Sequence, residues 1–370
     1  MPRRSPILLL TMLVVLVFGC ATRRARPPRL FPFRDSQKRW GYIDRHGKTV
    51  IDPQFPYASE FSEGLAFVSL PGREWGGYID EKGRMGIGPS RAWTHGQPFS
   101  EGRAAVWNYR LRLGSRQDKT GGVGSSRMTR PARYIDRTGE YITDRWFARC
   151  LDFSEGIGCA CVSGSTYAVN RAGDLLFSLP GFVGPFSEGL AAASRSTPEG
   201  PESGYVDITG KEVIPPRPGQ YHMPFQEGLA LVVGLDEFGL RFAADYIDRT
   251  GNLALQTPYR VRDLDLACFR EGLAVVRDSA GCFHMDHDAR PQYAERWSMA
   301  KPFSEGLAAV RVNDSTGRWV WGYIDRTGKL RIPPSLHDAF EFKGGVAQVV
   351  LEGNRWCCIN KKGELLGLQE

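Results

Sequence analysis

The sequence lacks the short motifs that carry the chemistry of several large enzyme classes. It contains no Gly-x-Ser-x-Gly, phosphate-binding loop, Gly-x-Gly-x-x-Gly or His-Glu-x-x-His motif. Histidine is scarce, with 6 residues in 370. The apolar run at residues 7–18 is shorter than the roughly 20 residues that a membrane-spanning helix needs. Gly is abundant but follows no Gly-X-Y period, which excludes collagen.

What is present indicates a folded protein built from short strands. Hydrophobic residues make up 42% of the chain and charged residues 24%, so the chain can bury a core. The 43 glycines, together with 11% aromatic residues, favour many tight turns between strands. A length of 370 residues allows two or three ordinary domains or one large repeat domain.

One pentapeptide pattern, first seen as Phe61-Ser62-Glu63-Gly64-Leu65, occurs eight times. Every copy keeps the Phe and the Gly three residues later, and a small residue stands two positions beyond that Gly. Seven copies keep the Glu, which Gly344 replaces in the last copy. The Phe and Gly positions are Phe61/Gly64, Phe99/Gly102, Phe153/Gly156, Phe186/Gly189, Phe225/Gly228, Phe269/Gly272, Phe303/Gly306 and Phe342/Gly345.

A second pattern, Tyr-Ile-Asp, alternates with the first and occurs nine times, with weaker copies ending at Asn170, Asp286 and Asn360. A Gly follows the Asp or Asn by three residues in every copy except the one at Asp286, where Ala289 stands. Asp-x-x-Gly suits a turn in which the Asp side chain accepts a backbone N–H and Gly adopts a positive φ. The strong copies include Tyr42/Asp44/Gly47 and Tyr323/Asp325/Gly328.

The two patterns together predict an all-β repeat domain over residues 40–370. Leu-Ala-x-Val and Tyr-Ile-Asp are β-prone and apolar, and a third short strand follows in places, so each unit is expected to contain about three strands. Such a unit cannot bury its own apolar face, and neighbours must stack. A propeller-like ring is favoured, closed by a unit shared between the termini, with an open solenoid or superhelix as the alternative.

These motifs resemble the WG-repeat family, also called KWG repeats. The Trp-Gly before Tyr-Ile-Asp stands at Trp40-Gly41, Trp75-Gly76 and Trp321-Gly322, and Trp356 keeps the Trp alone. The resemblance covers residues 40–366 and implies a bacterial β-repeat module. It implies no catalytic residues, because the recurring positions are architectural.

The N-terminus is similar to the signal of bacterial lipoproteins. Arg3 and Arg4 precede the apolar run, which ends in Val17-Phe18-Gly19-Cys20. The resemblance implies a signal peptide at residues 1–19, lipid modification of Cys20, and location in the bacterial cell envelope. Ala21 favours the outer membrane where the cell has one. An ordinary cleaved signal, with Cys20 incidental, is the alternative.

Two segments carry most of the positive charge. Residues 20–39 form an expected basic, Pro-rich tether, either attracted to anionic lipid or merely solvated. Residues 108–131 form an expected flexible insertion that either binds an anionic glycan, lipid or protein, or is a solvated loop. Without these segments and the signal, the body is mildly acidic. The candidate binding residues of the insertion are Arg110, Arg112, Arg116, Lys119, Arg127 and Arg130.

No catalytic or metal site is predicted. A repeated Glu has similar surroundings in each copy, whereas catalytic carboxylate pairs need unequal ones, so turn or cap hydrogen bonds are expected. Cys282, His284 and Asp286 would share one strand face and are possible metal ligands, but a drifted repeat copy accounts for them equally well. No cofactor is expected. Cys268 and Cys282 either form a disulfide or are buried thiols.

The leading functional hypothesis is therefore a lipid-anchored envelope scaffold that binds a protein or glycan and is not an enzyme. Tryptophans outside the Trp-Gly motif are candidates for a binding face. The alternatives are an envelope hydrolase with a site at the mouth of the ring, and a structural envelope component. The export signal disfavours nucleic acid as a partner, and the sequence leaves the oligomeric state open. The candidate tryptophans are Trp93, Trp107, Trp146, Trp297 and Trp319.

Overall fold

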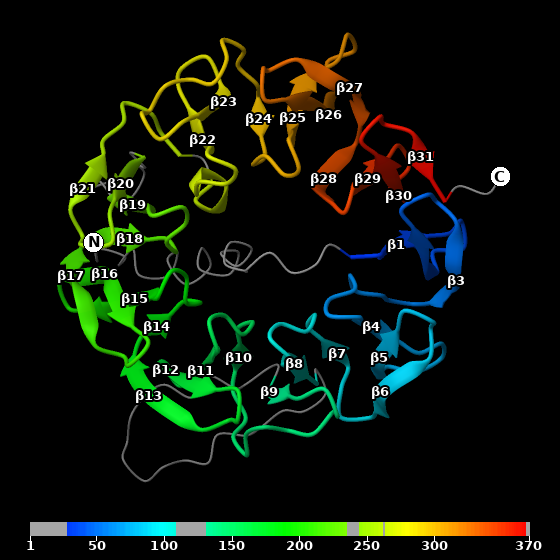
Figure 1. Ribbon diagram of the computed structural model, residues 1–370, viewed down its shortest axis with the longest axis horizontal. Helices are drawn as coiled ribbons and strands as arrows, with labels where there is room; N and C mark the ends of the chain where they lie inside the picture. The colour runs from blue at the N-terminus through cyan, green and yellow to red at the C-terminus, as the bar shows by residue number, and fades with distance from the viewer. Residues whose placement is uncertain (1–27, 109–130, 235–243, 262, 368–370) are drawn as a thin grey trace, which may run out of the picture.

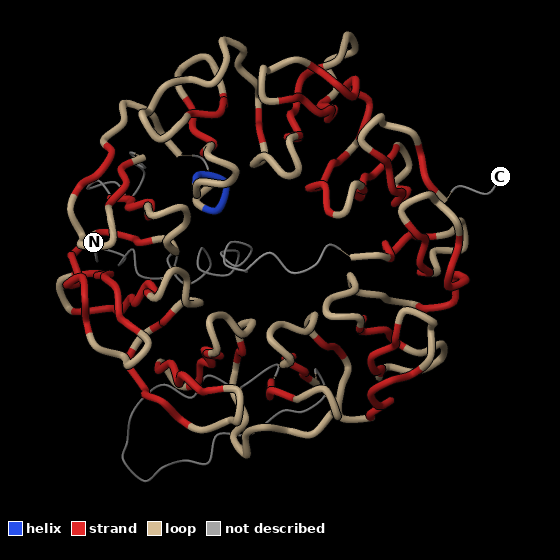
Figure 2. The backbone as a smooth tube through the Cα atoms, viewed as in Figure 1, coloured by secondary structure: helices blue, strands red, loops and turns tan. Residues whose placement is uncertain are grey.

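A computed structural model of the chain describes residues 28–108, 131–234, 244–261 and 263–367. In these residues nine small antiparallel sheets stand like blades in a ring (Figure 1). Within these ranges almost all regular structure is β, apart from one 3₁₀ turn at Asp265–Ala267 (Figure 2). The described part of the chain contains no helix long and apolar enough to span a membrane. The all-β, propeller-like prediction is confirmed.

The first four blades follow one another along the chain, each ordered from the inner edge of the ring outward. Blade 1 has β1 (Leu30–Arg34), β2 (Trp40–Asp44) and β3 (Thr49–Phe55), and blade 2 has β4 (Leu65–Ser69), β5 (Gly76–Asp80) and β6 (Met85–Ser90). Blade 3 has β7 (His95–Gly96), β8 (Ala104–Trp107) and β9 (Ala132–Ile135), and blade 4 has β10 (Arg149–Cys150), β11 (Ile157–Val162), β12 (Ser165–Asn170) and β13 (Leu175–Pro180).

The remaining five blades complete the circle in the same order. Blade 5 has β14 (Phe182–Val183), β15 (Leu190–Thr197), β16 (Gly200–Asp207) and β17 (Glu212–Pro218), and blade 6 has β18 (Gln220–His222), β19 (Ala230–Gly234), β20 (Asp245–Ile247) and β21 (Leu253–Leu255). Blade 7 has β22 (Ala274–Arg277) and β23 (Cys282–Met285), and blade 8 has β24 (Met299–Ala300), β25 (Leu307–Asn313), β26 (Trp319–Asp325) and β27 (Leu330–Leu336). Blade 9 has β28 (Asp338–Lys343), β29 (Val346–Leu351), β30 (Arg355–Asn360) and β31 (Leu365–Leu366).

A complete blade has four strands rather than the expected three. The strand that the sequence did not indicate is the innermost one, which spans only two or three residues in blades 3–6 and 8. So short a segment shows no alternation of apolar and polar residues. In blades 2 and 7 single bridges take its place, at Ala58↔Val68 and Arg260↔Arg277.

The core lies between the blades. Neighbouring residues of a strand point to opposite faces of the sheet, and here a blade covers each face. Tyr42 packs toward blade 2, against Phe61 and Ala66, whereas Ile43 packs toward blade 9, against Val346 and Cys358. This double burial explains why Tyr-Ile is apolar at both positions.

Two recurring small residues are required by close approach. A Cβ on Gly322 of the Trp-Gly motif would lie 2.6 Å from the carbonyl oxygen of Ile332, where the outermost strand bulges toward its neighbour. A Cβ on Gly158, the small residue two positions after the Gly of its copy, would lie 2.5 Å from the ring of Phe153. The Trp-Gly and Phe-x-x-Gly motifs therefore both fix distances between adjacent segments.

Blade 1 meets blade 9 by packing and side-chain hydrogen bonds, without a shared sheet. No sheet contains strands from both ends of the described chain, so the expected shared unit is wrong. Phe31 and Phe33 instead form a cluster with residues of blade 9, and Gln348 Nε2 donates to the carbonyl oxygen of Pro32 at 3.0 Å. The first blade begins with β1, so the expected tether loses residues 30–39 to the fold.

Candidate binding faces and seam pocket

The ring has two faces with different turns. Strand register places the Glu-Gly turns and the Asp-x-x-Gly turns at one end of each blade, because Leu65 pairs with Asp80 and Leu307 with Asp325. We call this end the turn face. The opposite end, where the second and third strands of each full blade are joined, as at Ser69↔Gly76 and Asn313↔Trp319, is called the hairpin face.

Each Glu-Gly turn holds its Glu in a left-handed conformation. In all seven copies φ of the Glu lies between 52° and 56°, and the following Gly has φ between 77° and 86°. Two positive φ values in a two-residue hairpin loop define a type I′ turn, which prefers Asn-Gly or Gly-Gly. A left-handed Glu costs about 1–2 kcal/mol, so its recurrence calls for a compensating interaction.

The compensation is a relay of Glu carboxylates from blade to blade. Glu101 in blade 3 accepts the N–H groups of Glu155 and Gly156 in blade 4, at 3.0 and 2.6 Å. Glu155 in turn accepts those of Glu188 and Gly189, both at 2.8 Å. The other links run from Glu63 to Gly102, Glu188 to Gly228, Glu227 to Gly272, Glu271 to Glu305 and Gly306, and Glu305 to Gly344 and Gly345.

The relay ends where the sequence loses its Glu. Gly344 occupies the Glu position of blade 9, and the described part of blade 1 contains no Glu-Gly turn for it to hold. A Glu at position 344 would therefore have the cost of a left-handed backbone, and its carboxylate would have no Glu-Gly turn of the next blade from which to accept hydrogen bonds. The turn-bond interpretation of the repeated Glu is confirmed, with the addition that the bonds join different blades.

Cations on the neighbouring Asp-x-x-Gly turns complete the relay. The Arg171 Nη2 atom lies 2.7 Å from Glu101 Oε2, and Arg137 and Lys361 pair in the same way with Glu63 and Glu305. Burial raises the pKa of Glu101, but the Arg171 guanidinium and the N–H groups of Gly156 and Glu155 outweigh it and hold the pKa below its usual value. The repeat patterns did not indicate these cation partners of the Glu side chains, although Arg or Lys follows the Asp or Asn in six of nine copies.

The repeated Tyr, Phe and Ser form a second set of bonds between blades. Tyr134 in blade 3 donates to the carbonyl oxygen of Leu151 in blade 4 at 2.6 Å, and its ring contacts Phe153 at 4.9 Å between centroids. Tyr42 and Tyr323 make the corresponding contacts with Phe61 and Phe342. The Ser of a Glu-Gly turn, such as Ser304, donates to the Phe carbonyl of the next blade.

The repeated Asp closes its own turn, as expected. Asp325 Oδ1 accepts the N–H groups of Thr327 and Lys329 at 2.8 and 3.2 Å, and Asp44 accepts those of His46 and Lys48. The hydrogen bond from the Thr327 hydroxyl is the main cause that lowers the pKa of Asp325 to about 2. The turn glycines Gly47 and Gly328 have φ of 85° and 82°.

The drifted copy at blade 7 is structural. His284 occupies the Tyr position, and its Nε2 lies 2.9 Å from the carbonyl oxygen of Lys301, the same bond that Tyr makes in other blades. Burial lowers the pKa of His284 to about 4. Asp286 is used in its own turn. No group of three His, Cys, Asp or Glu side chains converges as a metal site within the described ranges.

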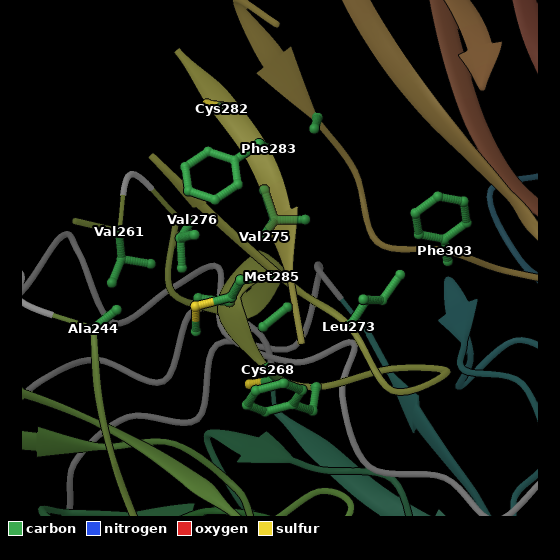
Figure 3. Close-up of a cluster of buried hydrophobic side chains, with 14 of the residues drawn as sticks. Ala244, Val261, Cys268, Leu273, Val275, Val276, Cys282, Phe283, Met285 and Phe303 are labelled. Atoms are coloured by element: carbon green, nitrogen blue, oxygen red, sulfur yellow. The ribbon is translucent and has the colours of Figure 1, made fainter. Parts of the chain in front are cut away.

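The cysteines outside the signal region are free thiols, mostly buried. Cys282 and Cys268 lie at opposite ends of the hydrophobic cluster around Phe283 and Met285, as Figure 3 shows. They do not form the disulfide that the sequence left open, because each fills part of the apolar core instead.

A pocket of about 240 Å³ lies at the seam between blades 9 and 1. Its apolar wall includes Leu30, Phe31 and Phe340, and Pro28, the first described residue, lies at its edge. Its charged groups are paired: Lys343 Nζ lies 2.7 Å from Glu60, and Glu341 lies 2.5 Å from Arg270. Lys301 donates to the carbonyl oxygen of Ala339 at 2.6 Å. No side chain of this pocket is arranged as a nucleophile with a base.

The hairpin face carries side chains that do not repeat. Trp319 is 50% exposed and lies beneath the guanidinium of Arg311, 4.8 Å from its ring centroid. Trp107, Trp146 and Trp297 are half-buried. Trp93 is only 4% exposed and donates from Nε1 to the hydroxyl of Tyr141 between two blades, so its expected place on a binding face is wrong.

The insertion emerges from this face between β8 and β9. The hairpin pairs as far as Trp107↔Ala132, and the N–H of Asn108 donates to the carbonyl oxygen of Pro131 at 3.4 Å. Arg73 and Arg91 line a pocket of about 290 Å³ with Trp75 on the adjoining part of the face. Cys20 and all six candidate cations of the insertion, Arg110, Arg112, Arg116, Lys119, Arg127 and Arg130, lie outside the described residues.

Four segments of the chain match one known protein family. The family described as "WG containing repeat" matches residues 40–72, 204–233, 293–315 and 321–356, which lie in blades 1–2, 5–6, 7–8 and 8–9. The chain contains WG repeats. No curated protein matches the sequence.

Solved structures share the architecture at low sequence identity. A eukaryotic initiation factor aligns with a TM-score of 0.63 at 12% identity, covering 92% of this chain and 95% of the other, which shows the fold alone. Apo AztD from Citrobacter koseri aligns at 0.41 and 10% identity, covering 92% and 91%. The β-propeller domain of the Trilobed protease from Pyrococcus furiosus aligns at 0.40 and 9% identity, covering 82% and 98%.

Proposed function

We propose that this WG-repeat protein is a lipid-anchored scaffold of the bacterial cell envelope that binds another macromolecule, a protein or a glycan, without catalysing a reaction. The anchor is the lipid on Cys20. The partner engages the hairpin face through the basic insertion at residues 108–131. The protein lies in the outer membrane where the cell has one.

The proposal rests on a difference between the two faces: repeated side chains hold the turn face together, whereas the hairpin face carries side chains that do not repeat. On the turn face the repeated Glu, Asp, Tyr and Ser side chains form hydrogen bonds within and between blades. These groups are therefore poor candidates for substrate chemistry. Non-repeating aromatic and basic residues lie on the hairpin face, as expected of a repeat protein that holds a rigid surface for a partner.

The seam pocket supports binding rather than hydrolysis. A hydrolytic site needs a nucleophile or activated water next to a base, with perturbed acid–base groups. The charged side chains of the pocket, Lys343 and Glu341 among them, are engaged in ion pairs instead.

The test compares retention of partners from envelope extract by the full chain and by a variant whose residues 109–130 are replaced with Asn-Gly. The ends of the insertion are already joined by the Asn108–Pro131 hydrogen bond, so a two-residue turn closes the β8–β9 hairpin without disturbing it. Lys362→Ala, an exposed change on the turn face, is the matched control.

The expected result is a protein or glycan retained by the full chain and by Lys362→Ala and lost from the shortened variant. Recovery of no partner by any of the three proteins contradicts the scaffold function. Equal recovery by all three removes the insertion from the binding surface. Cys20 is tested separately: globomycin is expected to block maturation, and unchanged processing contradicts the lipid anchor.

A further inference from the structure

The course of the chain into blade 1 limits how the ring can sit on a membrane. Leu30 pairs with Asp44, the first residue of a turn on the turn face, whereas Arg34 pairs with Trp40 near the hairpin face. Strand β1 therefore runs from the turn face to the hairpin face. Pro28, just before it, lies at the seam pocket beside Glu60 and Lys343.

The chain enters at the inner edge of blade 1 rather than at its outer rim. Strand β1 is the innermost strand of its sheet, and β3 is the outermost. Pro32 at the centre of β1 has no N–H to offer a further strand, and its carbonyl oxygen already accepts Gln348 Nε2. The N-terminal end of β1 thus lies at the inner edge of the turn face.

The length of chain before Pro28 decides which face can lie near the bilayer. The eight steps from Cys20 to Pro28 span at most about 28 Å, at roughly 3.5 Å per residue. The blade strands of 5–8 residues have a length of roughly 17–26 Å. A segment that ran through the centre of the ring would use about 17–26 Å of that length to reach the hairpin face, leaving only about 2–11 Å for a lipid to enter a membrane.

Charge around the point of entry favours the same arrangement. The exposed cations of the Asp-x-x-Gly turns in blades 9, 1 and 2 are Lys361, Lys362, Arg45, Lys48, Lys82 and Arg84. Lys361 pairs with Glu305 and Arg84 with Asp80, which leaves four cations against the exposed Glu364 and the half-buried Glu81. In blades 3 and 4 the equivalent turns are balanced, with Arg137 and Arg171 against Glu140 and Asp174. Cations near an anionic bilayer each contribute about 1 kcal/mol.

We infer that the turn face of the ring faces the lipid bilayer, with the sector of blades 9, 1 and 2 nearest to anionic head groups, and that the hairpin face points away from the membrane. This inference rests on the proposed anchor at Cys20. It places the base of the insertion, at Asn108 and Pro131, on the side open to a partner outside the membrane.

The test uses the chain from Cys20 onward, coupled through the Cys20 thiol to a maleimide lipid in vesicles, with Cys161→Ser to remove the half-buried thiol. A donor dye is attached through a noncanonical residue at position 362 on the turn face or at position 352 on the hairpin face of the same blade. Lys362 and Glu352 are both exposed, so they are matched sites. The acceptor is a dye on the lipid head groups.

Donor fluorescence at position 362 is expected to fall more than that at position 352 on phosphatidylcholine vesicles. Adding phosphatidylglycerol should widen the difference, and Arg45→Glu with Lys82→Glu should cancel that increase. Equal quenching at the two positions, or stronger quenching at 352, overturns the inference. Because the lipid is attached chemically, this result does not depend on processing in cells, and failure of the anchor itself appears only in the globomycin experiment.

Discussion

Replacing one Glu of the relay tests whether the hydrogen bonds between blades outweigh the free-energy cost of the left-handed Glu backbone. Glu101 is the best position, because its carboxylate accepts two N–H groups of blade 4, from Glu155 and Gly156, and meets Arg171. Its side chain is only 16% exposed. Three substitutions separate the bonds from the strain: Glu101→Ala, Glu101→Gly and Gly344→Ala.

The expected magnitudes follow from the geometry. Each charge-assisted hydrogen bond contributes about 1.5–3 kcal/mol, and the pair with Arg171, which is 51% exposed, adds at most about 1 kcal/mol. Water replaces part of this at the turn, so Glu101→Ala should lower the free energy of unfolding by about 2–4 kcal/mol. Glu101→Gly also removes the left-handed strain and should recover about 1–2 kcal/mol of that loss.

The substitution Gly344→Ala measures the cost of the left-handed backbone without any change in the hydrogen bonds of the relay. Gly344 has φ of 60° and no side chain to take part in the relay, so Ala at this position should cost about 1–2 kcal/mol. The difference between Glu101→Ala and Glu101→Gly should equal this cost. Urea unfolding monitored by Trp fluorescence and circular dichroism measures all three variants.

The pH dependence gives a second readout for Glu101. Its pKa is lower in the folded protein than in the unfolded chain, where it is about 4.3. The stabilisation is therefore present above pH 4.3 and is lost as the pH falls through the folded pKa. The gap in stability between wild type and Glu101→Ala should close over that range. If Glu101→Ala costs no more than Gly344→Ala at pH 7, the bonds of the relay do not offset the left-handed strain; if it costs nothing, the relay does not stabilise the ring.

Three further substitutions test other parts of the fold. Gly322→Ala should destabilise severely, because its Cβ would lie 2.6 Å from the carbonyl oxygen of Ile332, whereas Gly306→Ala, with open space around it, should cost only about 1–2 kcal/mol in urea unfolding. Tyr134→Phe should cost about 1–3 kcal/mol, because it leaves the buried carbonyl oxygen of Leu151 without its donor. His284 should weaken the fold as the pH falls from about 6.5 to 4, because the unfolded chain takes up its proton first; His284→Gln should reduce this slope in thermal unfolding.

Each of these three has a result that contradicts it. Equal losses for Gly322→Ala and Gly306→Ala would show that the outer strand can move away from the motif. An unchanged midpoint for Tyr134→Phe would mean that water reaches the carbonyl oxygen of Leu151. The same pH slope with and without His284 would assign the acid sensitivity to other groups.

Much of the architecture was predictable because it repeats. The nine Tyr-Ile-Asp copies correspond to the nine blades of the described residues, since each copy supplies the third strand of a complete blade. The innermost strands were missed because segments such as Arg149–Cys150 are too short to show periodicity. The shared closing unit was wrong because Phe31 and Phe33 lie in a segment whose Arg and Pro residues favoured an extended tether.

The sequence alone determined the repeat unit, the turns and the residues that each copy must keep. These features follow from the alternation of side chains along a strand and from the conformations of Gly and Asp, and every copy of the repeat shows them. Only the tertiary structure decided which partner each kept residue holds: Glu101 reaches 54 residues along the chain to the turn of the next blade, and Gln348 closes the ring on Pro32. Such bonds join segments far apart in sequence, so their geometry exists only after the blades have stacked.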